Sequence, residues 1–236
     1  DTYCEADPTK RPEILIREGI SNMASKIGDD GKFCAMTVPS IYCKTGGDEP
    51  EKFPGAFYYL ACFMSSLGSG FAEWYAAAGY TRGVSSYAVD HTSVKLGEIA
   101  INVLEPRSGS KDTFACNVIA NFRGSYYLWG NRTAAPLGED LTADHFLNIR
   151  QLCSTIKKQL YVACRRFTFD PNSDTLWFNF VNAITPTLDA MRADQGISDY
   201  RIIKVTTDKK ATLKAKIRII PIEAVEDFDL EVSLED

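Results

Sequence analysis

The stretch Leu213-Lys-Ala-Lys-Ile-Arg-Ile219 alternates strictly between apolar and basic residues, and it decides how the end of this chain is read. A second stretch, Phe228-Asp-Leu-Glu-Val-Ser-Leu234, alternates between apolar and mostly acidic residues. Successive side chains of a strand point to opposite faces, so both patterns predict half-buried strands. Laid side by side, the two strands would place opposite charges across from each other, which favours their pairing.

Such a ribbon lies so close to the end of the chain that one strand edge is left with unpaired backbone N–H and C=O groups. An edge of this kind is either covered by its own domain or recruits a strand from another molecule. The residues alone leave both readings open, an ordinary covered hairpin and an intermolecular sheet.

Length and composition describe an ordinary globular chain. Its 236 residues allow one large domain or two small ones. The net charge of −5 and the lack of a basic tract argue against a nucleic-acid partner. No run of about 18 uncharged apolar residues is present, so we expect no membrane-spanning segment. The chain begins with Asp1 and shows no signal-peptide pattern, which suggests a processed chain or a fragment.

Helical and strand periodicities alternate along the chain and predict an α+β fold. In the first half we expect helices over residues 13–27 and 56–67, an irregular strand over 33–43, a helical turn running into a strand over 94–104, and strands over 115–120 and 125–129. In the second half we expect a helix over 149–167 and strands over 200–205, 212–220 and 228–234. Between them we expect a helix capped by Ser173 or Asp174 that kinks or restarts near Thr185, because Pro186 removes a backbone donor.

These elements predict a mixed α/β region over residues 1–134, followed by a domain over residues 135–236. In the second domain a small, mainly antiparallel sheet would pack against two long helices. The weak boundary falls in residues 134–142, which contain Pro136 and Gly138.

Catalytic and metal-binding patterns are weak throughout. The seven cysteines are scattered without a CxxC pair, which is typical of reduced, mostly buried thiols in a protein made in the cytosol. Only His91 and His145 could serve as imidazole bases, and neither lies near a recognisable nucleophile motif. The glycine-containing turns at 68–70 and 79–83 match no phosphate-binding loop. We therefore expect no catalytic site, no cofactor and no metal, and an assembly protein rather than an enzyme.

The most specific motifs are Trp129-Gly-Asn-Arg-Thr133 and Phe169-Asp-Pro-Asn172 with Trp177 five residues on. The first resembles the Trp-Gly-x-Arg-Thr element of the contractile tail sheath proteins of bacteriophages. The second is similar to the Phe-Glu-Pro-Asn…Trp signature of that family. Together with weaker motifs in the same order, the resemblance covers roughly residues 53–234.

The weaker motifs are four short elements. Ala76-Ala-Ala-Gly79 with Arg82-Gly83 resembles the family's Ala-Pro-Ala-Gly…Arg-Gly turn, with Ala77 in place of the proline. Ile101-Asn102 is similar to the Ile-Asn of the strand that follows in the family, Asn148-Ile-Arg150 to an Asn-Val-Arg lead into a long helix, and Pro221-Ile-Glu223 to a Pro-x-Glu before the last strand. The motif residues, expected to be structural, are Gly79, Arg82, Gly83, Asn102, Trp129, Gly130, Arg132, Thr133, Arg150, Pro171, Asn172, Trp177, Pro221 and Glu223.

The resemblance implies a virion structural protein. Such a subunit polymerises helically around an inner tail tube and contracts to drive the tube through the host envelope. Its partners would be neighbouring sheath subunits and the inner tail tube protein, and it would be made in the cytoplasm of a bacterial host and reside in the virion tail. Sheath proteins of this family are usually longer, so the chain would be a C-terminal part or core fragment. Whether such a fragment polymerises or stays monomeric is left open.

Two surfaces would carry that function. We expect inter-subunit strand pairing through the apolar positions of the two alternating stretches, Leu213, Ala215, Ile217, Ile219, Phe228, Leu230, Val232 and Leu234. We expect a basic helix face to meet an acidic tube surface through Lys157, Lys158, Arg165 and Arg166. The alternatives are a sheath-like subunit of a secretion system or pyocin-like particle, and a cytosolic Cys-dependent enzyme.

Overall fold

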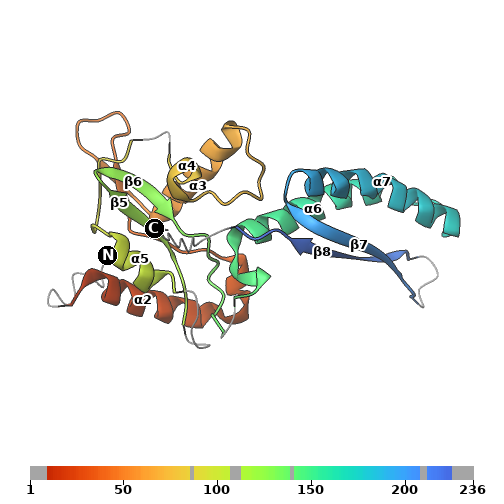
Figure 1. The fold of residues 1–236 in the computed structure, drawn as a ribbon, viewed down its shortest axis with the longest axis horizontal. Coiled ribbons are helices and arrows are strands. Elements are labelled where there is room, and N and C mark those ends of the chain that lie inside the picture. Colours follow the sequence, from red (N-terminus) through yellow and green to blue (C-terminus); the bar gives the residue numbers. More distant parts are fainter. Residues whose placement is uncertain (1–9, 86–87, 107–112, 139–140, 208–211, 225–236) are drawn as a thin grey trace, which may run out of the picture. The chain divides into compact units, whose positions relative to one another are not determined.

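The fold belongs to the predicted α+β class: helices and three small sheets alternate along the chain. The computed structural model describes residues 10–85, 88–106, 113–138, 141–207 and 212–224, drawn as ribbon in Figure 1. The chain divides into two compact units, Asp1–Lys157 and Lys158–Asp236. The two units are separated within a helix rather than in residues 134–142, and the domain division expected at residue 134 stays a prediction.

The first unit is organised around a hairpin. Strand β5 (Asn117–Phe122) pairs antiparallel with β6 (Ser125–Trp129), and β1 (Thr37–Val38) adds to β5 in parallel. Two residues connect β5 to β6, and both have positive φ: Arg123 at 54° and Gly124 at 91°. This is the backbone that a tight right-twisted hairpin requires, and glycine adopts it without strain. The amide of Gly124 donates to Asn121 Oδ1 at 3.0 Å, which closes the turn.

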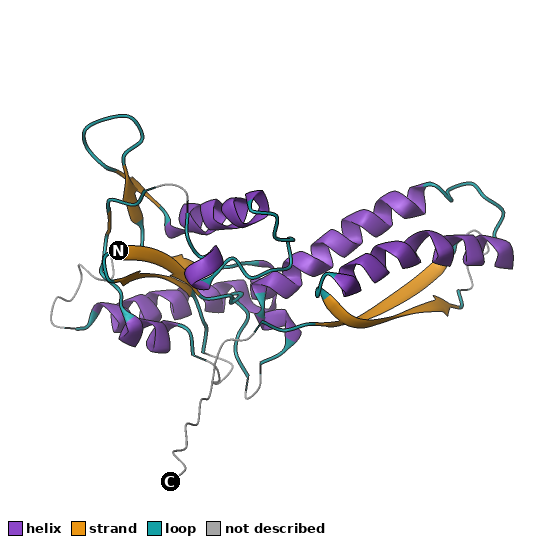
Figure 2. Cartoon of the chain, turned by 45° about the horizontal axis from the view of Figure 1, so that its top comes forward, coloured by secondary structure: helices purple, strands orange, loops and turns teal. Residues whose placement is uncertain are grey.

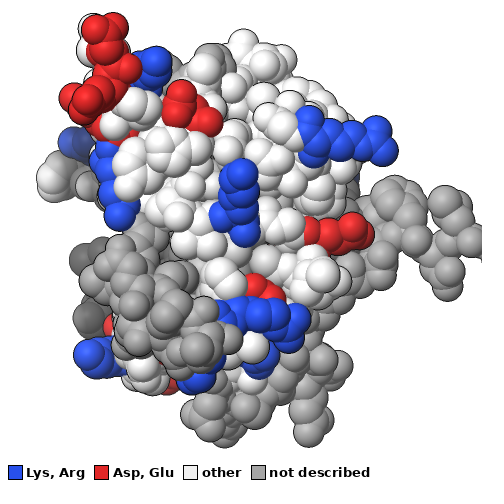
Figure 3. Space-filling view, turned by 90° about the vertical axis from the view of Figure 1, so that its left-hand side faces the viewer, with Lys and Arg blue, Asp and Glu red and all other residues white. Residues whose placement is uncertain are grey.

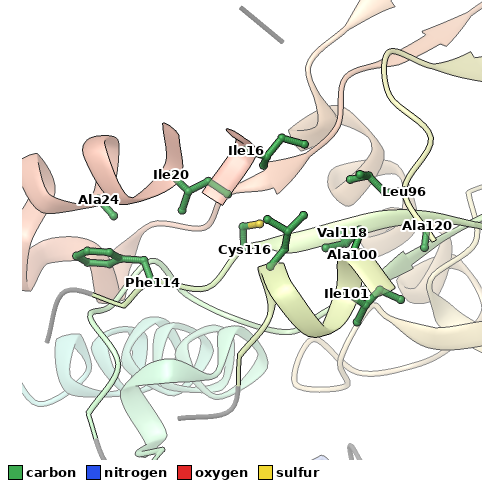
Figure 4. Packing of buried hydrophobic residues seen from close by; sticks show 11 residues of the cluster. Ile16, Ile20, Ala24, Leu96, Ala100, Ile101, Phe114, Cys116, Val118 and Ala120 are labelled. Carbon is green, nitrogen blue, oxygen red and sulfur yellow. The ribbon is translucent and has the colours of Figure 1, made fainter. Parts of the chain in front are cut away.

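Strand β5 is covered on both faces, and this explains its apolar run. On one face, Val118 and Ala120 lie against α2 (Pro12–Ile27) and α5 (Glu98–Leu104). Figure 4 shows this cluster between the helices and the strand. On the other face, Ile119 packs with Tyr58 and Cys62 of α3 (Gly55–Gly68). The hairpin is therefore the middle layer of the unit.

The remaining elements of the first unit surround this centre. A second sheet has the order β3-β2-β4, with every pairing antiparallel. Its strands are β2 (Ile41–Cys43), β3 (Glu51–Phe53) and β4 (His91–Thr92). Short helical elements complete the unit: η1 (Gly28–Phe33), α4 (Gly79–Arg82) and η2 (Ala143–His145). Helix α6 (Leu147–Arg165) begins in this unit and ends in the second.

The second unit pairs a long helix with a two-stranded ribbon. Helix α7 (Asp174–Ala193) begins at Ser173, whose hydroxyl accepts from the amide of Leu176 at 3.3 Å, as expected for an N-cap. Its buried positions repeat with helical spacing: Leu176, Phe180, Ile184, Leu188 and Met191. The ribbon consists of β7 (Ile197–Val205) and β8 (Lys214–Pro221), and Figure 2 shows it beside the helices of this unit.

Several predictions about local structure are wrong. Residues 94–104 contain no strand, because the apolar positions follow helical spacing and form α5. Asn102 therefore lies exposed on a helix and not in a strand. Residues 33–43 form two short strands, because Pro39 lacks the N–H that a continuous ladder needs. Helix α7 does not restart at Pro186. The predicted strand 228–234 lies outside the described residues.

The buried stripe of α7 gives a stability prediction. Ile184 is fully buried, whereas Ile220 of the same unit is 58% exposed. We expect Ile184→Ala to lower the free energy of unfolding by about 2–5 kcal/mol, since it removes buried methylene groups and leaves a cavity. The matched Ile220→Ala change should cost less than about 1 kcal/mol. Urea unfolding monitored by tryptophan fluorescence measures both, and equal losses would contradict the assignment of this core.

Candidate assembly surfaces and the polar network beneath them

The ribbon of the second unit has two chemically different faces. Tyr200, Ile202 and Lys204 of β7 lie opposite Ile219, Ile217 and Ala215 of β8. This face is turned to α7, because the Tyr200 hydroxyl donates to Asp189 Oδ1 at 2.8 Å and Lys204 Nζ lies 2.8 Å from Asp174 Oδ1. The hydrogen bond and charge of Lys204 hold the pKa of Asp174 below its usual value. The half-buried positions Leu213, Ala215, Ile217 and Ile219 all belong to the apolar alternation expected from the sequence.

The second edge of β8 has no partner strand within the described part of the chain. The sheet contains β7 and β8 only, and β8 is paired along its length to β7. Its other edge therefore presents a row of backbone donors and acceptors. The residues expected to pair there, Phe228, Leu230, Val232 and Leu234, lie outside the described residues, so their pairing stays a prediction.

The basic side chains expected on the long helix are all exposed. Lys157, Lys158 and Arg165 fall within about 100° of the circumference of α6, and Arg166 follows directly after the helix. The guanidinium of Arg165 lies 5.9 Å from the centre of the Tyr161 ring. No ion pair involves these four side chains among the residues that the structure describes. They form an exposed cationic surface, and this geometry does not identify what binds to it.

In the first unit, the Trp-Gly-Asn-Arg-Thr element is held by a buried amide. Asn117 of β5 is fully buried, and its Oδ1 accepts from the amide of Arg132 at 2.7 Å. Its Nδ2 donates to the carbonyl of Arg132 at 3.0 Å and to that of Met36 at 3.1 Å. The side chain of Asn117 thus makes hydrogen bonds to the backbone of two segments that are distant in the sequence, as a neighbouring strand would.

Arg132 itself is 1% exposed, and its charge faces a carboxylate and a ring. Its Nε lies 3.7 Å from Oε1 of Glu105, and the guanidinium lies 4.8 Å from the centre of the Phe146 ring. Oε1 of Glu105 also accepts from the amide of Asn131 at 3.3 Å. A buried guanidinium requires such partners, because desolvation without them costs several kcal/mol or more. These contacts hold Arg132 within the packing of the first unit, and its structural role stays a prediction.

Two asparagines join the start of α6 to the same element. Asn131 Nδ2 donates to Asn148 Oδ1 at 2.7 Å, and the amide of Asn148 donates back to Asn131 Oδ1 at 3.2 Å. Asn148 Nδ2 donates to the carbonyl of Trp74 at 3.1 Å. Arg150, the third residue of the Asn-Ile-Arg motif, lies 3.0 Å from Asp144 Oδ1 and over the Phe33 ring at 4.5 Å. The motif therefore positions the helix and leaves no catalytic group free.

The last residue of the element, Thr133, closes the network with His145. Thr133 Oγ1 donates to the carbonyl of Asp144 at 2.8 Å, and its amide donates to that of His145 at 2.9 Å. His145 Nδ1 accepts from the amide of Thr142 at 2.9 Å, which leaves Nε2 as the donor to the carbonyl of Pro136 at 3.1 Å. Both ring nitrogens are used in holding the backbone, so His145 is not available as a general base.

The alanine- and glycine-containing turn fits onto the hairpin. A Cβ on Gly83 would lie 2.4 Å from the carbonyl oxygen of Leu128, so only glycine fits there. Arg82 Nε donates to the carbonyl of Ala76 at 2.8 Å, and its guanidinium lies 5.1 Å from the centre of the Phe71 ring and 5.4 Å from that of Tyr75. These contacts stabilise the turn, although Ala77 replaces the proline of the motif.

The other motif residues are divided between the two units. Pro171 and Asn172 are exposed in the turn before α7. Trp177 is half-buried against Phe180 and lies 5.9 Å from Lys204 Nζ. Pro221 ends β8 opposite Ile197, and Glu223 is exposed beyond it. Gly79 opens α4 with φ at 80°.

Four cysteines of the described chain are poor nucleophiles because their pKa values are raised. Burial raises the pKa of the Cys62 thiol to about 12, and burial with the nearby Glu105 carboxylate raises that of Cys116. Burial raises the pKa of Cys164, and burial with the nearby Asp90 carboxylate raises that of Cys43. A raised pKa keeps the thiol protonated, and the thiolate is the reactive form. His91 lies beside Asp90 at 2.8 Å and stacks on Tyr42.

The described residues contain no group of three or more His, Cys, Asp or Glu side chains that could hold a metal ion. None of the helices in the described ranges combines the length and the apolar character needed to cross a membrane.

The fold is similar to that of chains in solved structures. One similar chain belongs to the cryo-EM structure of the anti-feeding prophage (AFP) baseplate, with a TM-score of 0.68 and 17% identity over 85% of this chain. Another belongs to the PVC sheath complex of an extracellular contractile injection system in its contracted state, with a TM-score of 0.73 and 15% identity over 93% of this chain. The chain is structurally similar to components of contractile injection systems.

The likeness has clear bounds. The matches span 54% and 60% of those two chains, so this chain corresponds to little more than half of either. At these identities the likeness concerns the fold. No sequence-family profile and no curated protein matches the chain.

The sequence patterns did not identify the side chains that hold the motifs in place. Asn117 and Glu105 lie outside the six motifs, and nothing in their local sequence distinguishes them from surface residues. A Thr-x-x-His spacing at 142–145 could have indicated the cap that His145 makes with Thr142.

The buried amide gives a second stability prediction. Gly130 has φ at 136°, and a Cβ there would lie 2.9 Å from both Cα and Oδ1 of Asn117. Gly124 also has positive φ, but a Cβ there would meet nothing within 4 Å. We expect Gly130→Ala to lower the free energy of unfolding by about 1–3 kcal/mol more than Gly124→Ala, since it adds displacement of Asn117 to the backbone strain. Urea denaturation of both variants tests this, and equal effects would show that Asn117 has room to move.

Proposed function

We propose that this chain is the sheath subunit, or a fragment of it, of a contractile particle that polymerises helically around an inner tube. The likeness to the contracted PVC sheath complex, over 93% of this chain, carries the proposal. The buried network around Trp129-Gly-Asn-Arg-Thr133 supports it, because the element that resembles the phage sheath motif is used here to hold the unit together. Electron microscopy of the concentrated chain should show rings or tubes, and only monodisperse particles at every concentration would contradict the proposal.

Two kinds of particle fit the proposed function. In a phage tail the subunit would be part of the virion, whereas in an extracellular injection particle or a secretion system it would not. The likenesses to chains of the AFP baseplate and the PVC sheath complex favour the extracellular injection particle. A helical polymer in either case needs heterologous, non-closing contacts between copies.

We propose the outer edge of β8 as one such contact. Main-chain hydrogen bonds to a strand of a neighbouring copy would persist while the rest of the subunit turns, which suits a polymer that must shorten without falling apart. The segment Phe228–Leu234 supplies the matching alternation in the sequence. Strand pairing of this kind accounts for the edge of β8 that has no partner strand among the described residues.

Removal of that segment tests the strand-pairing proposal. We expect a chain that ends at Asp227 to lose polymer assembly, because it lacks the pairing strand. A full-length variant with Leu230→Pro and Val232→Pro should behave likewise, since proline removes the backbone donors. Ser233→Ala is the matched control and should assemble normally. Sedimentation and negative-stain microscopy measure assembly, and tubes formed by the truncated chain would overturn this role for the segment.

The cationic face of α6 is proposed to meet the inner tube. Its four side chains lack ion pairs among the described residues, and a complementary acidic surface would supply them. Reversal of Lys157 and Lys158 to Glu should weaken co-sedimentation with tube protein about tenfold or more at low salt, since like charges then meet. Reversal of exposed Arg17 and Lys26 to Glu is the control with the same change in charge. Unchanged co-sedimentation would retire this surface as the tube contact.

The enzyme alternative has no support in the described geometry. The thiols with shifted pKa values are shifted toward the protonated form, and His145 uses both ring nitrogens on backbone groups. We propose that the chain has no catalytic activity. A thiol-reactive probe that labelled a single cysteine, together with ester or amide turnover lost on its mutation, would contradict this.

A further inference from the structure

The solvent face of the ribbon carries four cations and one carboxylate, that of Asp199, which the alternation of β7 places on the same face as Arg201. Arg201 of β7 lies directly opposite Arg218 of β8, and Lys216 and Lys214 follow on β8 opposite Ile203 and Val205. All four basic side chains are exposed, and none makes an ion pair within the described ranges of the chain. We call these four residues the basic ribbon face: Arg201, Lys214, Lys216 and Arg218.

This arrangement costs stability in an isolated subunit. Like charges directly opposite each other on a two-stranded sheet repel, and a cross-strand pair is only about 5 Å apart at Cα. On the other ribbon face the single cation, Lys204, is neutralised by Asp174 at 2.8 Å. The contrast within one ribbon indicates that the outer face is complemented by charges from elsewhere.

A second copy of the chain is itself an anionic partner. The whole chain carries −5, and the basic ribbon face contributes four positive charges, so the rest of the chain carries −9. Segregation of charge on one molecule favours a head-to-tail contact, in which the basic face of one copy meets an acidic surface of the next. Nucleic acid is a poorer candidate, because the remainder of the chain would repel it.

The hairpin loop between β2 and β3 offers a suitable acidic surface. It carries Asp48 and Glu49 beside a single cation, Lys44, and Glu51 follows as the first residue of β3; all four side chains are exposed. The loop projects from the end of its sheet in Figures 1 and 2. Glu51 accepts from Thr45 at 2.8 Å, whereas no ion pair involves Asp48 or Glu49 in the described part of the chain. In the space-filling view, most acidic side chains lie toward one upper corner, where a basic side chain lies as well, and other acidic and basic side chains are scattered over that face (Figure 3).

The spacing of the charges also agrees. Lys214, Lys216 and Arg218 repeat every second residue, about 6.7 Å apart along the strand. The carboxylates of Asp48 and Glu49 in the loop, with that of Glu51 at the start of β3, lie within four residues, so they can lie against two or more of these cations at once. The glycines at 46 and 47, beside which a Cβ would meet nothing within 4 Å, leave the loop tip free of bulky side chains.

We propose that the basic ribbon face binds the acidic β2–β3 loop of a second copy of this chain. The inference rests on the proposed assembly function and goes beyond it by naming the two surfaces of one contact. It is separate from the strand pairing at the edge of β8, since it uses the side chains of the face and not the backbone of the edge.

Zero-length crosslinking tests the contact in the full chain. Equal amounts of ¹⁴N- and ¹⁵N-labelled chain are mixed at low salt and coupled with a carbodiimide, which joins lysine amines to carboxylates in direct contact. Peptides that join Lys214 or Lys216 to Asp48 or Glu49 should contain one light and one heavy partner in half of the pairs. Linked peptides of a single isotope only would place the contact within one chain and overturn the proposal.

Charge reversal provides an independent test. One variant carries Lys214→Glu, Lys216→Glu and Arg218→Glu, and the other carries Asp48→Lys and Glu49→Lys. Each variant alone should self-associate at least about tenfold more weakly than the unaltered chain. A mixture of the two should recover association, because the reversed ribbon of one meets the reversed loop of the other, and the second contact of each pair is unaltered. Arg17→Glu with Lys26→Glu is the control and should change little.

The outcomes separate this contact from the assembly function. If all variants form tubes equally well, the function stands and the named contact is wrong. If the unaltered chain gives the mixed-isotope crosslinks but never forms tubes, the contact stands and the sheath function fails. If a polyglutamate peptide competes for the ribbon lysines while no second copy crosslinks to them, the occupant is another acidic protein and the proposal is overturned.

Discussion

The first unit depends on the side chain of Asn117. It is fully buried, and its amide binds the backbone of Arg132 with both its donor and its acceptor, while a second donor reaches Met36. Without it, backbone groups of two segments far apart in the sequence would be buried without partners, which costs about 1–3 kcal/mol for each group. The hydrogen bonds of Asn117 therefore fix the strand, the Trp-Gly-Asn-Arg-Thr element and the segment that leads into the second sheet relative to one another.

From this point the polar network runs outward through residues that share one task. Arg132, Asn131, Thr133 and Asn148 all hold backbone or neighbouring side chains in place, and together they set the start of α6 against the hairpin. The asparagine and threonine side chains of this network are hydrogen-bonded, whereas Nε of Arg132 makes no hydrogen bond among the described residues and lies 3.7 Å from the Glu105 carboxylate. The bonded members favour one arrangement, because a partial rearrangement leaves buried polar atoms without partners. A rigid first unit of this kind suits a subunit whose contacts with other copies must be reproducible.

The sequence predicts most elements whose side chains obey one clear period. Helix α7 and strands β6 and β8 are of this kind, since burial on one face leaves a regular pattern. Residues 94–104 were assigned wrongly in part, because a seven-residue helix is too short to separate its period from that of a strand. The polar network could not be foreseen, since Asn117 and Glu105 meet Arg132 and Asn131 only through the fold. The order of the short motifs indicated a sheath-like fold, but no local pattern could show which surfaces remain open.

The pairing of Arg201 with Arg218 has a consequence for free subunits. A two-fold axis through this face would lay cation against cation, so a closed symmetric dimer is electrostatically disfavoured there. Repulsion between identical basic faces thus keeps two free copies from pairing through their ribbons. In the proposed assembly, the face would then stay available until another copy presents the opposite charge.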